Sequence, residues 1–453
     1  MTRLFLFTLL SLSLIPSTRA EEPPKRPNVL LIVADDLGYA DVGFQGCQDV
    51  PTPHLDALAA SGVVCTSGYV SHPFCSPTRA GLLTGRYQQR FGHENNPAWL
   101  PQNARVGLPL DQSTIADALR ESGYETGAVG KWHLGAHPSF HPNRRGFTSY
   151  FGLLGGGHQY FDHNQFKTNP KKAEQEYFIP LVRNESPVEE SAYLTDAIGR
   201  EGAAFVSTPR DRPFFLYLAF NAPHTPLQAP PKYLERTQDV ADEKRRTYAA
   251  MICGMDDAIG QVMSALKARG LDQNTLVFFF SDNGGPVDVT HCRNTPLRGQ
   301  KGSVLEGGIR VPFVVSWPGV LKPGRFHAPV SSLDVLPTAL KAAGAKPSAL
   351  EGRDGVDLLP SLKSNATEAL AQRTLFWRTG GGASHALRKG SMKLVRFGNR
   401  PSELYDLTAD VGETNDLAAS RPDTLAALEN ELKAWSARLV APKWGNPTPA
   451  KKK

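Results

Sequence analysis

The stretch Val29-Leu30-Leu31-Ile32-Val33-Ala34-Asp35-Asp36-Leu37-Gly38 decides the fold class. Its apolar part is continuous instead of alternating with polar residues, which is typical of a parallel strand buried on both faces. Further strands are predicted at 63–70, 126–129, 214–220, 276–280 and 311–317, and helices at 53–60, 113–122 and 242–269. Gly270 is a suitable stop for the last helix. This alternation predicts an α/β fold around a large, mostly parallel central sheet flanked by helices.

The pattern changes after about residue 365. Short strands are predicted at 386–388, 392–396 and 403–406, followed by a helix at 423–438. This succession indicates a small antiparallel α+β subdomain. We therefore divide the chain into a signal peptide (1–20), a large catalytic domain (21–364), a C-terminal α+β subdomain (365–440) and a loose basic tail (441–453).

Composition and charge exclude several classes of protein. The 453 residues are 40% hydrophobic and 21% charged, which is the range of a folded globular protein. The segment 1–20 has a basic start, an apolar run from 4 to 15 and a small-residue end, so we expect an exported protein, periplasmic or secreted. No later run is long enough for a transmembrane helix. The net charge of +6 lies largely in this segment and in Lys451–Lys453, and no nucleic-acid partner is expected.

A polar cluster follows each of four predicted strands. The clusters are Asp35-Asp36, Lys131-Trp132-His133, Asn221–His224 and Asp282-Asn283. Ligands of open α/β sheets bind beyond the carboxyl ends of the strands, so we expect one shared site. Adjacent carboxylates repel each other and favour a bound cation. Their oxygens, with those of Asp282 and Asn283, suit Ca²⁺ or Mg²⁺. The chain has no Cys/His spacing of a zinc site.

The segment from Cys75 to Arg86 is the most informative in the chain. Ser76 is a plausible N-cap and Pro77 suits a first helical position. Cys75 would then sit at a helix N-terminus, where its thiol pKa is lowered and the thiolate could act as a nucleophile. Arg79 lies one turn further on, within reach of Cys75. The alternative is that Cys75 is a small buried hydrophobic residue.

The sequence Cys75-Ser76-Pro77-Thr78-Arg79, with Thr84-Gly85-Arg86 after it, resembles the C-x-P-x-R…T-G-R motif of the type I sulfatases, in the alkaline-phosphatase-like superfamily. The resemblance covers about residues 27–440. It includes 27–38, 130–135, 222–226, 281–284, 298–310 and 404–413. The family's activity implies hydrolysis of sulfate monoesters.

The resemblance also implies a cofactor and a role for each site residue. Cys75 would be converted by a maturation enzyme to formylglycine (3-oxoalanine), whose hydrate is the nucleophile. One Ca²⁺ would be held by Asp35, Asp36, Cys75 as formylglycine, Asp282 and Asn283. Arg79 would stabilise the formylglycine hydroxyl, and Lys131 and Lys301 would hold the sulfate. His133 would contact the hydrate and help to release sulfate, and His224 would protonate the leaving alcohol.

The only indication of the substrate in the sequence comes from two stretches between the predicted strands. The stretches 144–152 and 155–158 resemble carbohydrate-directed members that act on galactose or N-acetylgalactosamine sulfates. His158 follows three glycines and is predicted to read a sugar hydroxyl, with a histidine bonded to nearby backbone as the alternative. His291, Arg293 and His93 are weaker candidates. Alternative functions are a phosphonate or phosphate ester hydrolase and an inactive protein that binds sulfated glycans.

Four further cysteines remain, Cys47, Cys65, Cys253 and Cys292. An exported protein permits two disulfides, in any of three pairings, and free buried thiols are an equal possibility. Asn184 and Asn365 lie in glycosylation sequons, which matter only in a eukaryotic host.

Overall fold

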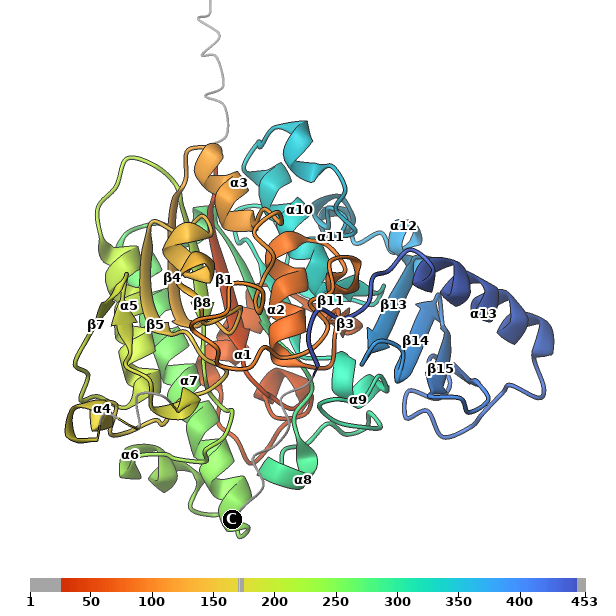
Figure 1. Ribbon diagram of the computed structural model, residues 1–453, viewed down its shortest axis with the longest axis horizontal. Helices are drawn as coiled ribbons and strands as arrows, with labels where there is room; N and C mark the ends of the chain where they lie inside the picture. The colour runs from red at the N-terminus through yellow and green to blue at the C-terminus, as the bar shows by residue number, and fades with distance from the viewer. Residues whose placement is uncertain (1–25, 170, 172–174, 446–453) are drawn as a thin grey trace, which may run out of the picture.

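A computed structural model describes residues 26–169, 171 and 175–445 (Figure 1). The predicted signal peptide and the three terminal lysines lie outside these residues. The strands of the main sheet are β1 (Asn28–Ala34), β2 (Val63–Cys65), β4 (Glu125–Lys131), β5 (Ser149–Leu153), β6 (Val182–Arg183), β7 (Ser186–Pro187), β8 (Phe214–Ala219), β9 (Thr275–Ser281), β10 (Phe313–Ser316) and β11 (Gly324–Phe326). They form one ten-stranded sheet in the order β11-β2-β10-β9-β1-β8-β4-β5-β6-β7.

The centre of this sheet is parallel, as predicted. Strands β9, β1, β8, β4 and β5 all run in the same direction. Strand β10 runs antiparallel to both β9 and β2. The strand expected over 63–70 is interrupted, because Gly68–Tyr69 (β3) leaves the sheet and pairs with β12 (Val330–Ser331).

Helices cover both faces of the sheet (Figure 1). The longer helices are α1 (Pro53–Ala60), α2 (Cys75–Thr84), α3 (Ile115–Glu121), α5 (Leu194–Ser207), α7 (Glu243–Ala268) and α10 (Val335–Ala342). Leu30 and Ile32 of β1 belong to the core with α1, α5 and α7, whereas Val29 and Leu31 belong to the core with α2, α3 and α10. Each fully buried side chain of this kind contributes about 1.5–3 kcal/mol of hydrophobic free energy. A strand buried on both sides explains the unbroken apolar run.

Helix boundaries follow local capping. The helix expected at 113–122 begins after Thr114, whose side chain caps the amide of Asp117. Helix α7 is capped by Asp242. Gly270 follows this helix with a φ of +65°, as its predicted role as a stop requires. The shorter helices are α4 (Gln165–Thr168), α6 (Pro231–Leu234), α8 (Val287–Thr290), α9 (Glu306–Ile309), α11 (Leu359–Ser364) and α12 (Glu368–Ala371).

The C-terminal part forms a separate antiparallel sheet, as predicted. Its strands are β13 (Thr374–Thr379), β14 (Ser384–Lys389), β15 (Met392–Phe397) and β16 (Glu403–Asp406), and helix α13 (Pro422–Ser436) packs on it. Strand β13 was not predicted. Lys393 of β15 is fully buried and binds both Glu306 and Glu413 at 2.8 Å, which ties this sheet to the large domain.

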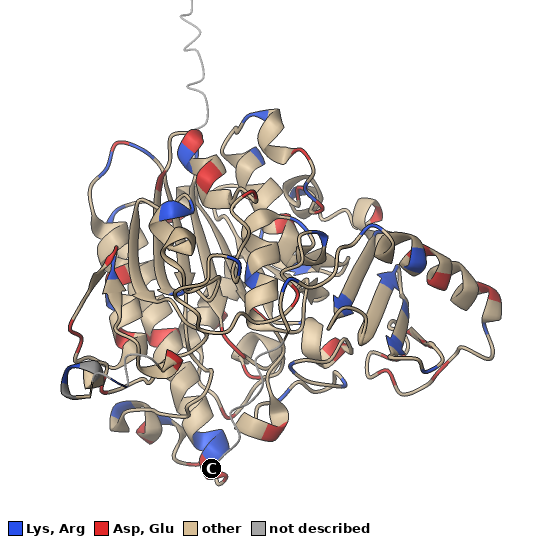
Figure 2. Cartoon of the chain, viewed as in Figure 1, with Lys and Arg blue, Asp and Glu red and all other residues tan. Residues whose placement is uncertain are grey.

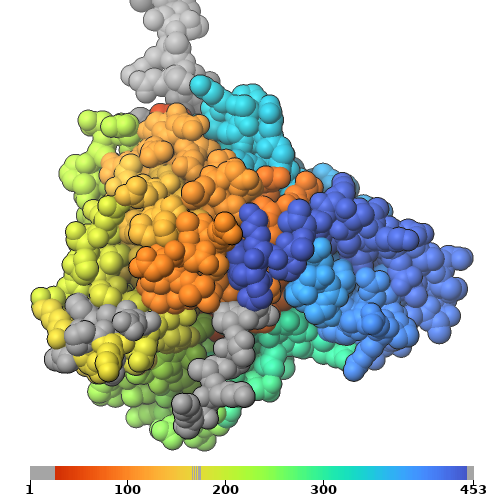
Figure 3. All heavy atoms as spheres, viewed as in Figure 1, coloured from red at the N-terminus to blue at the C-terminus, as the bar shows by residue number. Residues whose placement is uncertain are grey.

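The segment expected to be a loose tail is partly ordered against the large domain. The amide of Lys443 donates to the carbonyl of Gly92 at 2.9 Å, and Trp444 bonds to Asn95. The prediction of a loose segment is wrong for 441–445. Figure 3 shows this dark-blue segment lying on the surface formed by residues near 90.

Three further features concern the cysteines, the charges and the length of the helices. All five cysteines are free, so the alternative of free thiols holds in this structure. Lys and Arg are interspersed with Asp and Glu over both parts of the fold (Figure 2). Among the described residues, no helix has the length and apolar character needed to cross a membrane.

Candidate active site

Four parallel strands deliver polar side chains to one buried site at their carboxyl ends. Asp35 and Asp36 follow β1, Lys131 ends β4 and His133 lies two residues later, Asn221 and His224 follow β8, and Asp282 and Asn283 follow β9. Direct contacts join the clusters. Lys131 Nζ lies 2.5 Å from Asp35 Oδ2, and Asn283 Nδ2 donates to Asp36 Oδ1 at 2.7 Å. The arrangement follows from the parallel order of the strands.

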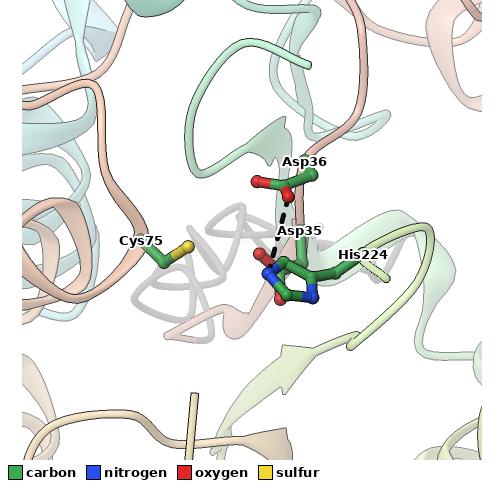
Figure 4. Close-up of side chains that lie close together, drawn as sticks. All are labelled: Asp35, Asp36, Cys75 and His224. Atoms are coloured by element: carbon green, nitrogen blue, oxygen red, sulfur yellow. Dashed lines mark ion pairs between the residues drawn. The ribbon is translucent and has the colours of Figure 1, made fainter. Parts of the chain in front are cut away.

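The carboxylates surround a place that fits a hard cation. Ligand atoms of Asp35, Asp36, Cys75 and His224 all lie within 4.8 Å of one another, and the sulfur of Cys75 points toward the carboxylates (Figure 4). Asp35 Oδ1 and Asn283 Oδ1 are buried without a hydrogen-bond partner. Buried oxygens without partners are costly unless an ion or water binds them. The oxygen-rich donor set is therefore suited to Ca²⁺.

Asp36 is held by groups that favour its charged form. Lys301 Nζ lies 2.7 Å from Asp36 Oδ1, and His224 Nε2 lies 3.6 Å from Oδ2. Burial alone would raise the pKa of Asp36, but Lys301 and His224 outweigh it and lower the pKa to about 2. Asp36 also has a φ of +65°, a conformation that costs free energy in a residue with a side chain.

Arg79 and Asp282 form a second buried pair. Arg79 donates to Asp282 Oδ2 through Nε at 3.0 Å and through Nη2 at 2.8 Å. Its Nη1 donates to the carbonyl of Lys131 and to the hydroxyl of Tyr217. Both charged side chains are fully buried. The guanidinium group thus fixes Asp282 and the end of β4 in one arrangement.

Cys75 occupies the first turn of α2, but the predicted cap is wrong. The helix begins at Cys75, with Phe74 in the extended N-cap position. Ser76 is not the cap because it is already the second residue of the helix; its Oγ donates to the carbonyl of His133 at 2.6 Å, and its amide donates to Asn96 Oδ1. Burial raises the pKa of the Cys75 thiol to about 12, so the expected lowering by the helix terminus does not occur.

Two histidines lie at the site, and they differ in whether Nδ1 has a hydrogen-bond partner among the described residues. His224 Nδ1 lies 2.7 Å from the carbonyl of Thr225, which fixes the proton on Nδ1. His133 has a φ of +57°, and its Nδ1 is buried without a partner. Burial lowers the pKa of His224 to about 3 and that of His133 in the same direction.

The four candidates for substrate recognition lie in different settings. His158 is buried, with its two ring nitrogens 2.7 and 2.8 Å from the carbonyls of Gln159 and Ile179, so the alternative of backbone bonding describes it. His93 is buried beneath Ser76. His291 pairs with Asp242, and Arg293 pairs with Asp49. Arg293 lines a surface pocket of about 600 Å³, together with Asp49 and Asp242.

The sequence analysis did not identify Glu176 and Tyr177, which lie next to the predicted site residues. Glu176 Oε1 accepts from the amide of Gly156 at 2.6 Å, and the ring of Tyr177 lies 6.3 Å from that of His224. A Cβ atom at Gly156 would lie 2.6 Å from His133 Nε2. The three consecutive glycines that precede His158 were the available signal, since a backbone without side chains can pass this close to other groups.

Two family models match the part of the chain that forms the fold and the site. The family model described as Sulfatase matches residues 27–345, and a model described as N-sulphoglucosamine sulphohydrolase, C-terminal, matches residues 300–438. The chain belongs to the sulfatase family.

Relatives and solved structures agree with this assignment. The chain is 35% identical over 354 residues to N-acetylgalactosamine-6-sulfatase of Mus musculus, an alignment that covers 75% of this chain and 66% of that enzyme. It is 35% identical over 462 residues to arylsulfatase A of Homo sapiens, covering 92% and 88% of the two chains. The crystal structure of Ps i-CgsB in complex with k-i-k-neocarrahexaose has a TM-score of 0.88 and 40% identity, covering 94% of this chain and 96% of that chain.

Proposed function

We propose that the chain is an exported sulfatase that removes sulfate from a carbohydrate ester, using formylglycine at position 75 and one Ca²⁺. The observation that carries the proposal is the setting of Cys75, whose sulfur faces the Asp35 and Asp36 carboxylates. Three cationic side chains, the buried Arg79 and Lys131 and the partly exposed Lys301, pair with three acidic ones, so the protein groups are close to neutral overall. One divalent cation would leave a positive site that suits an anionic ester.

Ca²⁺ would bind the oxygens of Asp35, Asp36, Asp282 and Asn283, beside residue 75. When present, a formylglycine hydrate at residue 75 would supply the hydroxyl that accepts the sulfuryl group, and Ca²⁺ would offset negative charge on the ester oxygens.

The lysines bind the substrate anion. Lys131 and Lys301 contact the Asp35 and Asp36 carboxylates and would offer ammonium protons to sulfate oxygens. Arg79 is held by Asp282 and keeps the first turn of α2 in place below residue 75. These groups are fixed before the substrate binds, which is the condition for strong electrostatic stabilisation of a transition state.

Two histidines move protons. The Nδ1 proton of His224 is committed to the carbonyl of Thr225, so proton donation to the leaving alcohol takes place from Nε2. Asp36, 3.6 Å from Nε2, partly opposes the lowering of the His224 pKa by burial. His133 Nδ1, which has no hydrogen-bond partner among the described residues, would accept a proton when sulfate is released.

The names of the relatives support a class of substrate. One relative is named for N-acetylgalactosamine 6-sulfate, and one similar structure is a complex with k-i-k-neocarrahexaose. Both names support a galactose or N-acetylgalactosamine sulfate as the substrate. The glycine-rich loop 155–157 lies against His133 and Tyr177, and such a sugar would be contacted through this loop.

The test combines mass spectrometry with a substrate panel. The tryptic peptide that contains residue 75 should carry an aldehyde in place of the thiol in the exported protein. The purified protein should release sulfate from galactose and N-acetylgalactosamine sulfates, and faster from nitrophenyl sulfate than from nitrophenyl phosphate or a phosphonate ester. An intact thiol with no turnover would support an inactive glycan-binding protein, and preference for phosphorus esters would support the hydrolase alternative.

A further inference from the structure

The loop that follows α2 returns to the start of the same helix. Asn96 Oδ1 accepts a hydrogen bond from the amide of Ser76 at 3.1 Å, and His93 Nε2 lies 2.6 Å from Ser76 Oγ. Ser76 is adjacent to Cys75 in the chain. Residues 93–96 therefore hold the N-terminus of helix α2.

Ser76 also contacts a second site residue, His133. Its Oγ donates to the carbonyl of His133 at 2.6 Å. A hydroxyl has one proton to donate, so the contact with His93 must be a bond from Nε2–H to Oγ. His133 has a φ of +57°, a conformation that persists only where surrounding contacts fix it. The chain of bonds from His93 through Ser76 is such a contact.

The C-terminal segment covers this loop. Trp444 Nε1 donates to the carbonyl of Asn95 at 3.0 Å, and Asn95 Nδ2 donates to the carbonyl of Trp444 at 2.7 Å. The indole and the His93 ring meet edge to face, with centroids 4.8 Å apart. Figures 1 and 3 both show the dark-blue segment beside the loop that follows α2.

A second anchor holds the same loop from the C-terminal sheet. Glu94 is fully buried and binds Arg378 of β13, with Nη2 of the arginine 2.6 Å from Oε2. Arg378 Nη2 also donates to the carbonyl of Val440, just before the covering segment. The loop is thus clamped between two C-terminal elements that contribute no side chain to the acidic cluster.

We propose that Trp444 is a positioning residue for the sulfatase reaction. It fixes His93, which through Ser76 sets both residue 75 and the backbone of His133. Removal of the indole would leave the substrate-binding lysines in place but loosen the alignment of the nucleophile and the proton acceptor. Misalignment of reacting groups lowers kcat more than it changes KM. The kinetic part of this inference rests on the proposed function.

Kinetics of three variants test the proposal. Trp444→Ala should lower kcat by roughly tenfold or more with KM within about twofold of wild type, each rate being divided by the fraction of aldehyde at residue 75. Trp444→Phe keeps a ring against His93 and should recover most of the rate. Lys443→Ala is the matched control, because Lys443 contacts Gly92 through its backbone amide and its side chain is exposed.

Hydrogen exchange provides a readout that does not depend on activity. Trp444→Ala should increase exchange of amides in 75–80 as well as in 88–96, while Lys443→Ala should not. An unchanged kcat together with unchanged protection of 75–80 would overturn the proposal. If Trp444→Ala does not fold, Asn95→Ala, which removes the bond to the Trp444 carbonyl, takes its place. If the wild type releases no sulfate, the proposed function fails and hydrogen exchange still decides the positioning role.

Discussion

Lys301 Nζ lies 2.7 Å from Oδ1 and 2.8 Å from Oδ2 of Asp36, so one ammonium group spans both oxygens of a buried carboxylate. The Lys301 side chain is 16% exposed and that of Asp36 is 2% exposed. The lysine is therefore the solvent-facing member of the pair. An anion that enters the site meets Lys301 before it meets the carboxylates.

Lys301→Ala should lower kcat/KM by about two to three orders of magnitude, because it removes a preorganised cation from the charged transition state. The measurement is initial rates of sulfate release at several substrate concentrations. Lys322→Ala is the control, since Lys322 is an exposed loop lysine. Wild-type kcat/KM in Lys301→Ala would remove Lys301 from sulfate binding.

Cys75→Ala should abolish turnover and leave the fold intact, because the thiol makes no hydrogen bond among those described and an alanine fits the first turn of α2. Cys253→Ala is the matched control, since Cys253 is also a buried free thiol but lies on α7, away from the acidic cluster. It should cost about 1 kcal/mol of stability and retain activity. Residual turnover by purified Cys75→Ala would refute the nucleophile role.

The sequence predicted the parts of the site that depend on strand order. The unbroken apolar runs before Asp35 and Asp282 indicate strands buried on both faces, and parallel strands place their carboxyl ends together. The motif around Cys75 predicted the helix that carries this residue. These inferences rest on patterns among neighbouring residues, which are visible in a single amino-acid sequence.

Long-range contacts account for what the sequence analysis missed. Ser76 matches an N-cap locally, yet its hydroxyl is used by His133, 57 residues away. Tyr177 and Trp444 reach their partners only through the tertiary fold. His158 follows a glycine run that suggests a ligand, but backbone carbonyls occupy both of its nitrogens. Such partners cannot be read from spacing along the chain.

Lys393→Met should lower the free energy of unfolding by about 3–5 kcal/mol, because Glu306 and Glu413 would remain buried without their shared cation. The loss is measured by urea unfolding. Lys389→Met is the control, since Lys389 pairs with Glu431 at the surface, where an ion pair is worth about 0–1 kcal/mol. Equal losses in the two variants would contradict a buried tie between the two parts of the fold.

Ca²⁺ should bind the chelator-treated protein at one site and raise its Tm, since an ion that binds only the folded state adds about 2.7 kcal/mol at a concentration of 100 Kd. Titration calorimetry gives the stoichiometry. Asn283→Ala should weaken binding by about tenfold or more, because it removes a buried oxygen that has no protein partner. Asp257→Asn, in a different acidic cluster with His54 and Asp256, should leave binding unchanged. Equal affinities for Asn283→Ala and wild type would place the ion elsewhere.

His72 should make the fold less stable in mild acid. Burial lowers its pKa to about 3, whereas a histidine in an unfolded chain titrates near about 6.5. Between these values the unfolded chain binds a proton that the folded protein does not, so stability falls by about 1.4 kcal/mol per pH unit as the pH decreases. His72→Asn keeps an acceptor for the Phe74 amide, which His72 Nδ1 provides at 3.2 Å, and removes the titration. Relative to wild type, its free energy of unfolding should rise by about 2 kcal/mol from pH 7 to pH 5, and parallel stability curves would contradict the role of His72.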